Sequence, residues 1–489
     1  MKEILIETLT PVHIGSGRIL LGGTEHIPFK TAGVIAVLDD RKILETIGES
    51  NISKWVAAIT AGTSIYELLT AMRSTLKPED VSLRLIKGSH LPAQENSIRE
   101  QILTVQQKPI IPGSSLKGSL RTAWFSREVL KKGPLSKREI STEKHGKIKY
   151  SDENLKREIL GGNPNQDLFR LLRLDDYIFD HTECLKSETL NLRGKGWEMK
   201  DAVSQFIECI PTGSYSRGRL QEATDLKKSI KTHGTRENQL PGMESFSILE
   251  LLSRANEQTL AIINKEIRLW EQREENLPKG ATHLLTELYR LKQEAEACKN
   301  TDGAAVIRLG FGSGHDSLTG GWQSVSLGTE LQKEVANAVR RNSKYEGLEF
   351  PKSRRLVNNG TPLGFIRLTL MGTSEIDGVI KSYKDKAESA KREIEKAIEI
   401  KLAEELERQE AARKPIPFNG KLKPNIKLEG TIVRLENNLG IAEFEVNGER
   451  MEALVRRLNN PDIGSIIVVL VAQLPLGKLK EVNFERYKK

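Results

Sequence analysis

Three glycine-rich segments constrain this chain most, because each sets a tight turn beside hydroxyl and basic side chains. They are Pro11–Arg18 (PVHIGSGR), Ile111–Arg121 (IPGSSLKGSLR) and Arg308–His315 (RLGFGSGH). Glycine reaches positive φ and lets a backbone approach a ligand closely. Successive backbone N–H groups in such turns form concavities that bind anions. Three such segments in one chain predict contact with a long polyanion rather than with one small phosphate ligand.

Composition indicates a soluble protein of several domains with acidic partners. The chain has 489 residues, 75 Lys and Arg against 66 Asp and Glu, and a net charge of +9, a length that fits roughly two to four domains. Its three cysteines match neither a disulfide framework nor a zinc site, as is typical of a reducing compartment. The N-terminus does not resemble a signal peptide, and no apolar run approaches the about 20 residues of a membrane helix. We therefore expect a cytoplasmic location.

The hydrophobic pattern predicts strands and helices in a mixed order. Amphipathic helices are expected over 247–276 and 282–299, and a charged helix over 381–414, where Lys391 and Glu395 form an i,i+4 pair. The polar stretch 130–161 is expected to be an exposed insertion. Short strands separated by turn signals predict a small all-β module over 424–489.

The second glycine-rich segment predicts a helix that starts at a ligand. Ser114 or Ser115 is expected to cap this helix, and Lys117 and Arg121 are four residues apart, on one helix face. The spacing from Gly113 to Gly118 is that of half a P-loop, but a serine stands where its lysine should be, so nucleotide hydrolysis is not expected. An ordinary capped helix packed on a sheet stays an alternative.

The first and third segments each contain one histidine, His13 and His315. Gly15, Ser16 and Gly17 lie between His13 and Arg18, and we find no second titratable group at a spacing that makes His13 a general base. A simple turn stays an alternative. The third segment follows a short strand but lacks the spacing of a dinucleotide fingerprint.

A short basic run closes the series of motifs. Lys352, Arg354 and Arg355 predict either a phosphate clamp or a solvated turn. Aromatic residues make up only 5% of the chain, so tracking of a backbone fits better than extensive base stacking.

Taken in order, five segments resemble the RAMP superfamily, and within it the subunit at the crRNA 3′ end of type III-A CRISPR (Csm) effector complexes. They are Thr8–Gly17, Ile111–Arg121, Leu172–Asp176 with Glu208–Gly213, Arg308–Gly314, and Phe350–Arg355 with Pro362–Gly364. The resemblance covers roughly residues 1–370. The charged helix and the β module are not part of the family's usual pattern.

The resemblance implies an α+β fold with ferredoxin-like (RRM-like) domains and helical insertions. It implies a non-catalytic subunit that binds the guide 3′ region, caps a filament of backbone subunits, and supports crRNA maturation and antiviral defence, without cofactor or metal. Partners would be crRNA and the other type III RAMP subunits, backbone and small, with target RNA and trimming nucleases as further candidates. Candidate RNA contacts are His13, Gly15, Ser16, Gly17, Arg18, Ser114, Ser115, Lys117, Gly118, Arg121, Arg308, Gly310, Gly312, Gly314, His315, Lys352, Arg354 and Arg355.

Two alternatives stay open. Some RAMP proteins cleave RNA, so the chain could be an endoribonuclease that uses His13 or His315 with Asp175 or Asp176. The C-terminal module could be an OB-like barrel that grips single strands, or a docking module for trimming nucleases. The expected domains are 1–245, a RAMP domain with insertions; 246–300, a helical insertion; 301–380, the second RAMP half; 381–414, the charged helix; and 424–489, the β module.

Overall fold

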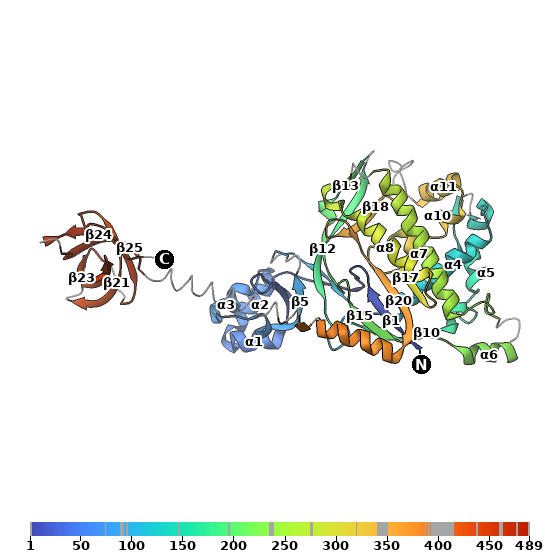
Figure 1. Ribbon diagram of the computed structural model, residues 1–489, viewed down its shortest axis with the longest axis horizontal. Helices are drawn as coiled ribbons and strands as arrows, with labels where there is room; N and C mark the ends of the chain where they lie inside the picture. Colours follow the sequence, from blue (N-terminus) through green and yellow to red (C-terminus); the bar gives the residue numbers. More distant parts are fainter. Residues whose placement is uncertain are drawn as a thin grey trace. The chain divides into compact units, whose positions relative to one another are not determined.

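The chain forms two compact units, residues 1–387 and 388–489, which are considered separately (Figure 1). The computed structural model describes residues 2–73, 75–88, 92–93, 96–144, 147–193, 196–233, 239–273, 277–318, 320–339, 351–386, 388–389, 392, 415–436, 439–458, 463–475 and 478–487. The finer division of the first unit at residues 245, 300 and 380 stays a prediction.

A four-stranded antiparallel sheet gathers strands from the beginning, middle and end of the first unit. Its order is β15 (Tyr215–Gly218), β1 (Lys2–Thr8), β20 (Phe365–Gly372) and β17 (Ala304–Arg308). Ile4 and Ile6 of β1 share one face of the sheet and are fully buried, and Leu5 on the opposite face is also buried. Both glycine-rich segments that follow β1 and β17 therefore emerge from one sheet.

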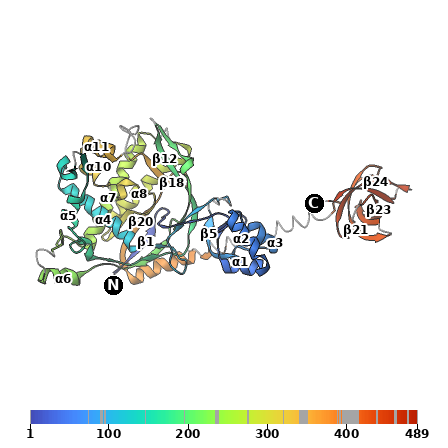
Figure 2. The same cartoon turned by 180° about the vertical axis from the view of Figure 1, so that it is seen from behind.

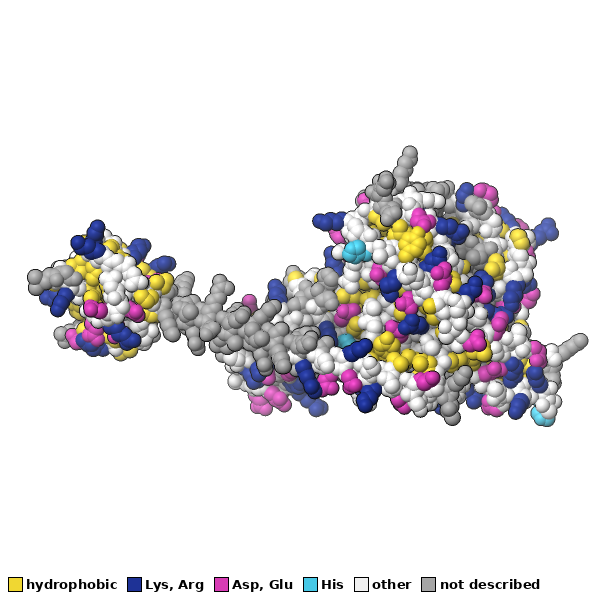
Figure 3. All heavy atoms as spheres, in the orientation of Figure 1, with side chains coloured by type: hydrophobic (Ala, Val, Ile, Leu, Met, Phe, Trp, Pro, Cys, Tyr) yellow, Lys and Arg dark blue, Asp and Glu magenta, His cyan; other side chains and the backbone are white. Residues whose placement is uncertain are grey.

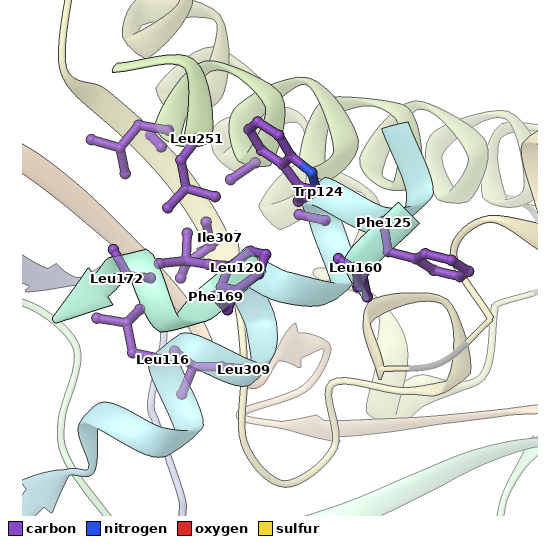
Figure 4. Packing of buried hydrophobic residues seen from close by; sticks show 14 of the residues in the cluster. Leu116, Leu120, Trp124, Phe125, Leu160, Phe169, Leu172, Leu251, Ile307 and Leu309 are labelled. Atoms are coloured by element: carbon purple, nitrogen blue, oxygen red, sulfur yellow. The ribbon is translucent and has the colours of Figure 1, made fainter. Parts of the chain in front are cut away.

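Three helices cover this sheet: α4 (Gly113–Lys131), α7 (Ile248–Glu271) and α8 (Leu284–Lys299). Leu116, Leu120 and Trp124 recur every four residues on α4, so they share the face that is buried. Figure 4 shows them packed with Leu251 of α7 and Ile307 of β17. The two amphipathic helices predicted from the sequence are confirmed, as α7 and α8.

The prediction of an exposed insertion over 130–161 is wrong. This stretch contains η3 (Lys137–Ile140), the hairpin β8 (Ser141–Lys144) and β9 (Lys147–Tyr150), and α5 (Glu153–Leu160). Leu135, Ile140, Leu155 and Leu160 are buried in the main core. An amphipathic element needs an apolar residue only at every third or fourth position. The many Lys and Glu residues between those positions made the stretch look polar throughout.

A second, ten-stranded sheet carries the first glycine-rich segment. Its path is β2 (Gly15–Leu20), β6 (Ile98–Gln101), β14 (Gln205–Cys209), β12 (Glu183–Arg193), β5 (Ser82–Gly88), β4 (Val34–Leu38) and β3 (His26–Phe29). The long strand β12 also pairs with β13 (Gly196–Met199) and β18 (Ser353–Val357), and β18 pairs with β19 (Thr361–Pro362).

Smaller elements complete the first unit. Helices α1 (Asp40–Ile47), α2 (Ile52–Ala61) and α3 (Tyr66–Met72) lie beside β5, as Figure 2 shows from behind. The remaining pairs are β7 (Ile110–Ile111) with β11 (Tyr177–Ile178) and β10 (Leu172–Leu174) with β16 (Leu220–Glu222). The remaining helices are α6 (Thr224–His233), α9 (His315–Leu318), α10 (Gln323–Ser326) and α11 (Thr329–Val339). The mixed α and β content is as expected, whereas the ferredoxin-like arrangement stays a prediction.

The second unit contains a closed five-stranded barrel, which confirms the predicted small all-β module. Its strands are β21 (Lys427–Glu436), β22 (Leu439–Val446), β23 (Glu449–Arg456), β24 (Ile466–Gln473) and β25 (Glu481–Tyr487), in the order β21-β22-β23-β25-β24. Phe444, Val455 and Val469 fill its interior. The helix expected from residue 381 already starts at 373, and residues 393–414 of that prediction lie outside the described residues.

Candidate nucleic-acid interface

The first and third glycine-rich segments meet, although almost 300 residues separate them in the chain. The backbone N–H of Phe311 donates to the carbonyl oxygen of His13 over 2.8 Å. The ring of His13 meets the ring of Phe311 edge-on, with 5.4 Å between centroids. The two segments therefore form one surface.

Glycine is required at the contact for two separate reasons. Gly310, Gly312 and Gly314 have φ values of 79°, 80° and 81°, which L side chains rarely adopt. In addition, a Cβ on Gly310 would lie 2.6 Å from the His13 carbonyl oxygen, whereas a Cβ on Gly314 would meet nothing within 4 Å. The curvature of the third segment thus depends on all three glycines, whereas its close approach to His13 depends on Gly310.

His13 is an internal anchor of the first segment. Only 2% of its surface is exposed, and its Nδ1 lies 2.6 Å from the carbonyl oxygen of Glu208. Because a carbonyl oxygen only accepts, Nδ1 must carry the proton. Burial lowers the pKa of His13 below its ordinary value, so the ring is neutral near pH 7. Its Nε2 faces Gly15, where a Cβ would lie 3.3 Å away.

A buried ionic network supports this anchor. The side chain of Glu208 is fully buried; it accepts from Arg84 Nη2 over 3.0 Å and from Thr182 Oγ1 over 2.7 Å. It also accepts from the backbone N–H of Gln101 over 3.2 Å, and the Gln101 side chain accepts from the N–H of Ile14 over 2.9 Å. The network ties the first segment to β6 and β14, which fixes its place before any ligand arrives.

Two arginines flank the ring of Phe311 at this contact. Their guanidinium carbons lie 5.9 Å (Arg99) and 5.1 Å (Arg355) from the ring centroid. Arg99 donates to the side-chain oxygen of Gln205 over 2.7 Å, and Arg355 donates to the carbonyl oxygen of Val203 over 3.0 Å. Within the described part of the chain, neither arginine forms an ion pair with a carboxylate. We call His13, Arg99, Phe311 and Arg355 the loop-junction site.

The charge of the loop-junction site suits an anion. Burial and the nearby charge of Arg99 both lower the pKa of Arg355, which means that the two cations repel each other. A phosphate between them would relieve that repulsion and accept charge-assisted hydrogen bonds from the N–H groups that remain free. Elsewhere on the surface, Lys and Arg alternate with Asp and Glu on the face seen in Figure 3.

Two of the predicted contact residues, Arg308 and Arg354, have hydrogen-bond partners inside the protein. Arg308 donates to the carbonyl oxygens of Leu363 and Gly312 over 2.9 and 3.0 Å, and burial lowers its pKa to about 10. Arg354 donates twice to Glu266, over 2.7 Å each. These two arginines hold the third segment and β18 in place. An RNA contact by either arginine stays a prediction.

Other predicted residues of the first and third segments and of the basic run have local partners or positions outside the loop-junction site as defined. Arg18 is exposed and pairs with Glu25 over 2.6 Å, and Ser16 donates to Glu100 over 2.9 Å. His315 lies beside Asp316, with 3.2 Å between Nδ1 and Oδ1. Lys352 lies immediately before β18, and Gly17 has a φ of 91°.

At the second segment, the predicted serine cap is wrong. Pro112 occupies the N-cap position of α4, so Ser114 and Ser115 fall in its first turn. The carboxylate of Asp176 instead accepts from the N–H of Gly113 over 2.8 Å. It occupies the positive end of the helix that was expected to face outward, as a carboxylate at a helix N-terminus does favourably.

The basic residues of α4 are also engaged. Lys117 donates to the carbonyl oxygen of Leu172 over 3.1 Å, and burial lowers its pKa. Arg121 pairs with Asp167 over 2.8 Å, and Gly118 is exposed beside them. RNA contacts by Lys117 and Arg121 would have to compete with these bonds.

The residues proposed for catalysis have structural partners. Asp175 accepts two side-chain hydrogen bonds from Arg219, over 3.0 Å each, and these hold the pKa of its carboxyl below the ordinary value. Asp176 caps α4, and His13 is bonded to Glu208. Among the described residues, no three metal-ligating side chains form a group that could hold a metal ion. No described helix is long and apolar enough to cross a membrane.

Sequence reasoning missed Arg99, Phe311 and the support from Arg84 and Glu208. Phe311 could have been noticed, because it is the one aromatic residue among the glycines of the third segment. Arg99 carries no local signal, since pairing of β6 with β14 and β2 is what brings it to the site.

The chain belongs to the RAMP superfamily, whose model matches residues 5–315. It is 24% identical over 402 residues to the CRISPR system Cms protein Csm5 of Methanocaldococcus jannaschii, covering 76% of this chain and 89% of that protein. These findings confirm the resemblance that the five sequence segments predicted. The barrel, from residue 427 onward, lies outside the matched superfamily region.

One solved structure with a TM-score above 0.5 supports the fold. A chain in a cryo-EM structure of a Csm–crRNA–target RNA ternary complex of a type III-A CRISPR-Cas system is 20% identical, with a TM-score of 0.55, covering 76% of this chain and all of that one. The crystal structure of T. onnurineus Csm5 is 17% identical, with a TM-score of 0.49, over 74% of this chain and 99% of that one.

Proposed function

We propose that this chain is a non-catalytic, crRNA-binding subunit of a type III-A CRISPR complex. It would bind the 3′ region of the guide and cap the filament of backbone subunits. Its partners would be crRNA, target RNA and the other Csm subunits, as the content of the related ternary complex suggests. The observation that carries the proposal is the pair Arg99 and Arg355, which are held by neutral groups and flank Phe311 where two glycine-rich segments meet.

The site favours readout of the RNA backbone. Arg99 is held through Nε and Arg355 through one Nη, so each guanidinium keeps further N–H groups for phosphate oxygens. The ring of Phe311 is flanked by both arginines and by His13, which leaves it little room to stack on a base. Backbone contacts fix register without reading sequence, as expected where base pairing reads the target.

The test is the double variant Arg99→Ala/Arg355→Ala, assayed for crRNA binding over a range of salt concentrations. We expect at least about a tenfold loss of affinity at physiological salt, because two charge-assisted contacts are removed. The slope of log affinity against log salt should fall by about 1.4, or 0.7 for each lost phosphate contact on a single strand.

The control is Arg41→Ala/Lys54→Ala, which removes the same charge from exposed positions on α1 and α2. If the control and the double variant have the same affinity and slope, general electrostatics rather than the loop-junction site holds the RNA. The non-catalytic part of the proposal needs its own assay, in which the purified chain is incubated with guide precursor and target RNA. Cleavage that disappears in His13→Gln would overturn it.

A further inference from the structure

The barrel of the second unit carries most of its arginines toward one end. One end contains the last residues of β21, β23 and β25 and the first residues of β22 and β24; the other contains the first residues of β21, β23 and β25 and the last residues of β22 and β24. The first end, which we call the arginine end, carries four of the barrel's five arginines: Arg434, Arg456, Arg457 and Arg486. The described lysines of the barrel region, Lys421, Lys423, Lys427, Lys478 and Lys480, start from the other end, and Lys427 reaches Glu485 of β25 over 2.5 Å.

Exposed aliphatic side chains gather at the arginine end. Val433, Leu435 and Leu439 are 36%, 43% and 40% exposed, and Ile463 is 60% exposed. Hydrogen bonds of 2.8 and 3.0 Å between Ile432 and residues 464 and 465 bring Ile463 beside β21. Single exposed apolar residues are ordinary, but a group of them at one end of a small domain marks an interaction surface. Figure 3 shows apolar side chains at the barrel surface next to Lys and Arg.

Two of the four arginines at this end form no ion pair with a carboxylate among the described residues. Arg434 pairs with Glu452 over 2.6 Å, and Arg456 pairs with Glu481 over 2.8 Å. Arg457 and Arg486 are exposed, and neither forms an ion pair among the described residues of the barrel. The arginine end therefore combines apolar area with uncompensated positive charge.

We propose that the arginine end docks a protein segment that is apolar and carries carboxylates. Exposed aliphatic residues beside arginine are typical of a protein–protein interface. The carboxylates of the partner would pair with Arg457 and Arg486. This inference goes beyond the proposed function, because the barrel lies outside the matched superfamily region.

RNA fits this surface less well. Phe484 and Tyr487, the aromatic residues of β25, pack on each other at 5.0 Å and against the barrel core, so their faces are not free for base stacking. The outward side of β22 and β23 carries Glu443, Glu445 and Glu452. A second copy of this chain, docked through the same end, would place Arg457 and Arg486 against themselves.

The test places a photo-crosslinking residue, p-benzoylphenylalanine, at position 439 of the full-length chain in host cells. A matched probe at position 478 samples the lysine end. We expect position 439 to form an adduct with a polypeptide whose crosslinked peptide contains Asp or Glu beside apolar residues. We expect Arg457→Glu/Arg486→Glu to lower the yield roughly tenfold, with the thermal melting of the chain unchanged. Reversing the mapped carboxylates to Lys should restore the yield.

Any of four results would overturn the proposal. They are an adduct with RNA, an adduct with a second copy, equal or absent adducts at both probe positions, and a yield that charge reversal does not change. The crosslinking experiment tests only the barrel, so a negative result there leaves the proposed crRNA binding at the loop-junction site unaffected. Equally, loss of the proposed crRNA binding would leave the docking proposal unaffected.

Discussion

The contact between the first and third glycine-rich segments can be tested with two glycines that differ in one respect. Gly310 and Gly314 have nearly the same φ, 79° and 81°. Alanine at either position must adopt left-handed backbone, at a cost of about 1–2 kcal/mol, which loss of freedom in the unfolded chain offsets by roughly 0.4–1 kcal/mol. Gly314→Ala should therefore destabilise the chain by about 1 kcal/mol or less.

Gly310→Ala meets a further obstacle. Its Cβ would lie 2.6 Å from the His13 carbonyl oxygen and 3.3 Å from Ile14 Cγ1. Backbone oxygen cannot rotate away as a side chain does, so the two segments must separate. Overpacking of this kind costs about 1–3 kcal/mol, and the hydrogen bond from Phe311 to His13 is worth about 1 kcal/mol more. We expect a total loss of about 3 kcal/mol.

Urea denaturation of both variants measures the difference, and crRNA titration measures its effect on binding. Because Phe311 moves with the contact, Gly310→Ala should weaken crRNA affinity more than Gly314→Ala. Equal loss of stability in the two variants would refute the reasoning, since only the close approach distinguishes them. Equal loss of affinity would show that the loop junction does not position the arginines.

Three further predictions concern the supporting residues. Arg84→Ala leaves the buried carboxylate of Glu208 without its cation and should cost about 3–5 kcal/mol in urea unfolding; a loss below 1 kcal/mol would contradict the anchoring role. Arg121→Ala removes a half-exposed pair with Asp167 and should cost at most about 1 kcal/mol, while a large loss of crRNA affinity in this variant would identify a second RNA contact. Burial lowers the pKa of His26, so as pH falls the unfolded chain is protonated at His26 at a higher pH than the folded chain. The stability that is present above pH ~6.5 is therefore lost as pH falls, by at most about 1.4 kcal/mol per pH unit. The fall in urea midpoint between pH 7.5 and 5.5 should be smaller in His26→Gln than in the parent chain.

Much of the local structure could be predicted from the sequence. The glycine-rich turns, the helices α7 and α8, and the short strands of the barrel depend on residues close together in the chain. The errors arose where a local pattern was ambiguous. Ser114 and Ser115 are residue types that often cap helices, but the N-terminus of α4 is capped by the carboxylate of Asp176, which is distant in the chain. Residues 130–161 looked solvated because charged residues outnumber the few that enter the core.

The sequence by itself determined which backbone turns are possible and how many basic side chains are available. Only the tertiary structure decided which of those side chains are engaged by partners inside the fold. Arg308 and Arg354 are used inside the fold, whereas Arg99 and Arg355 keep N–H groups free beside Phe311. The physical reason is that a cation is neutralised by whatever acceptor lies within a few ångströms. Those neighbours are set by strand pairing across hundreds of residues, which no local pattern records.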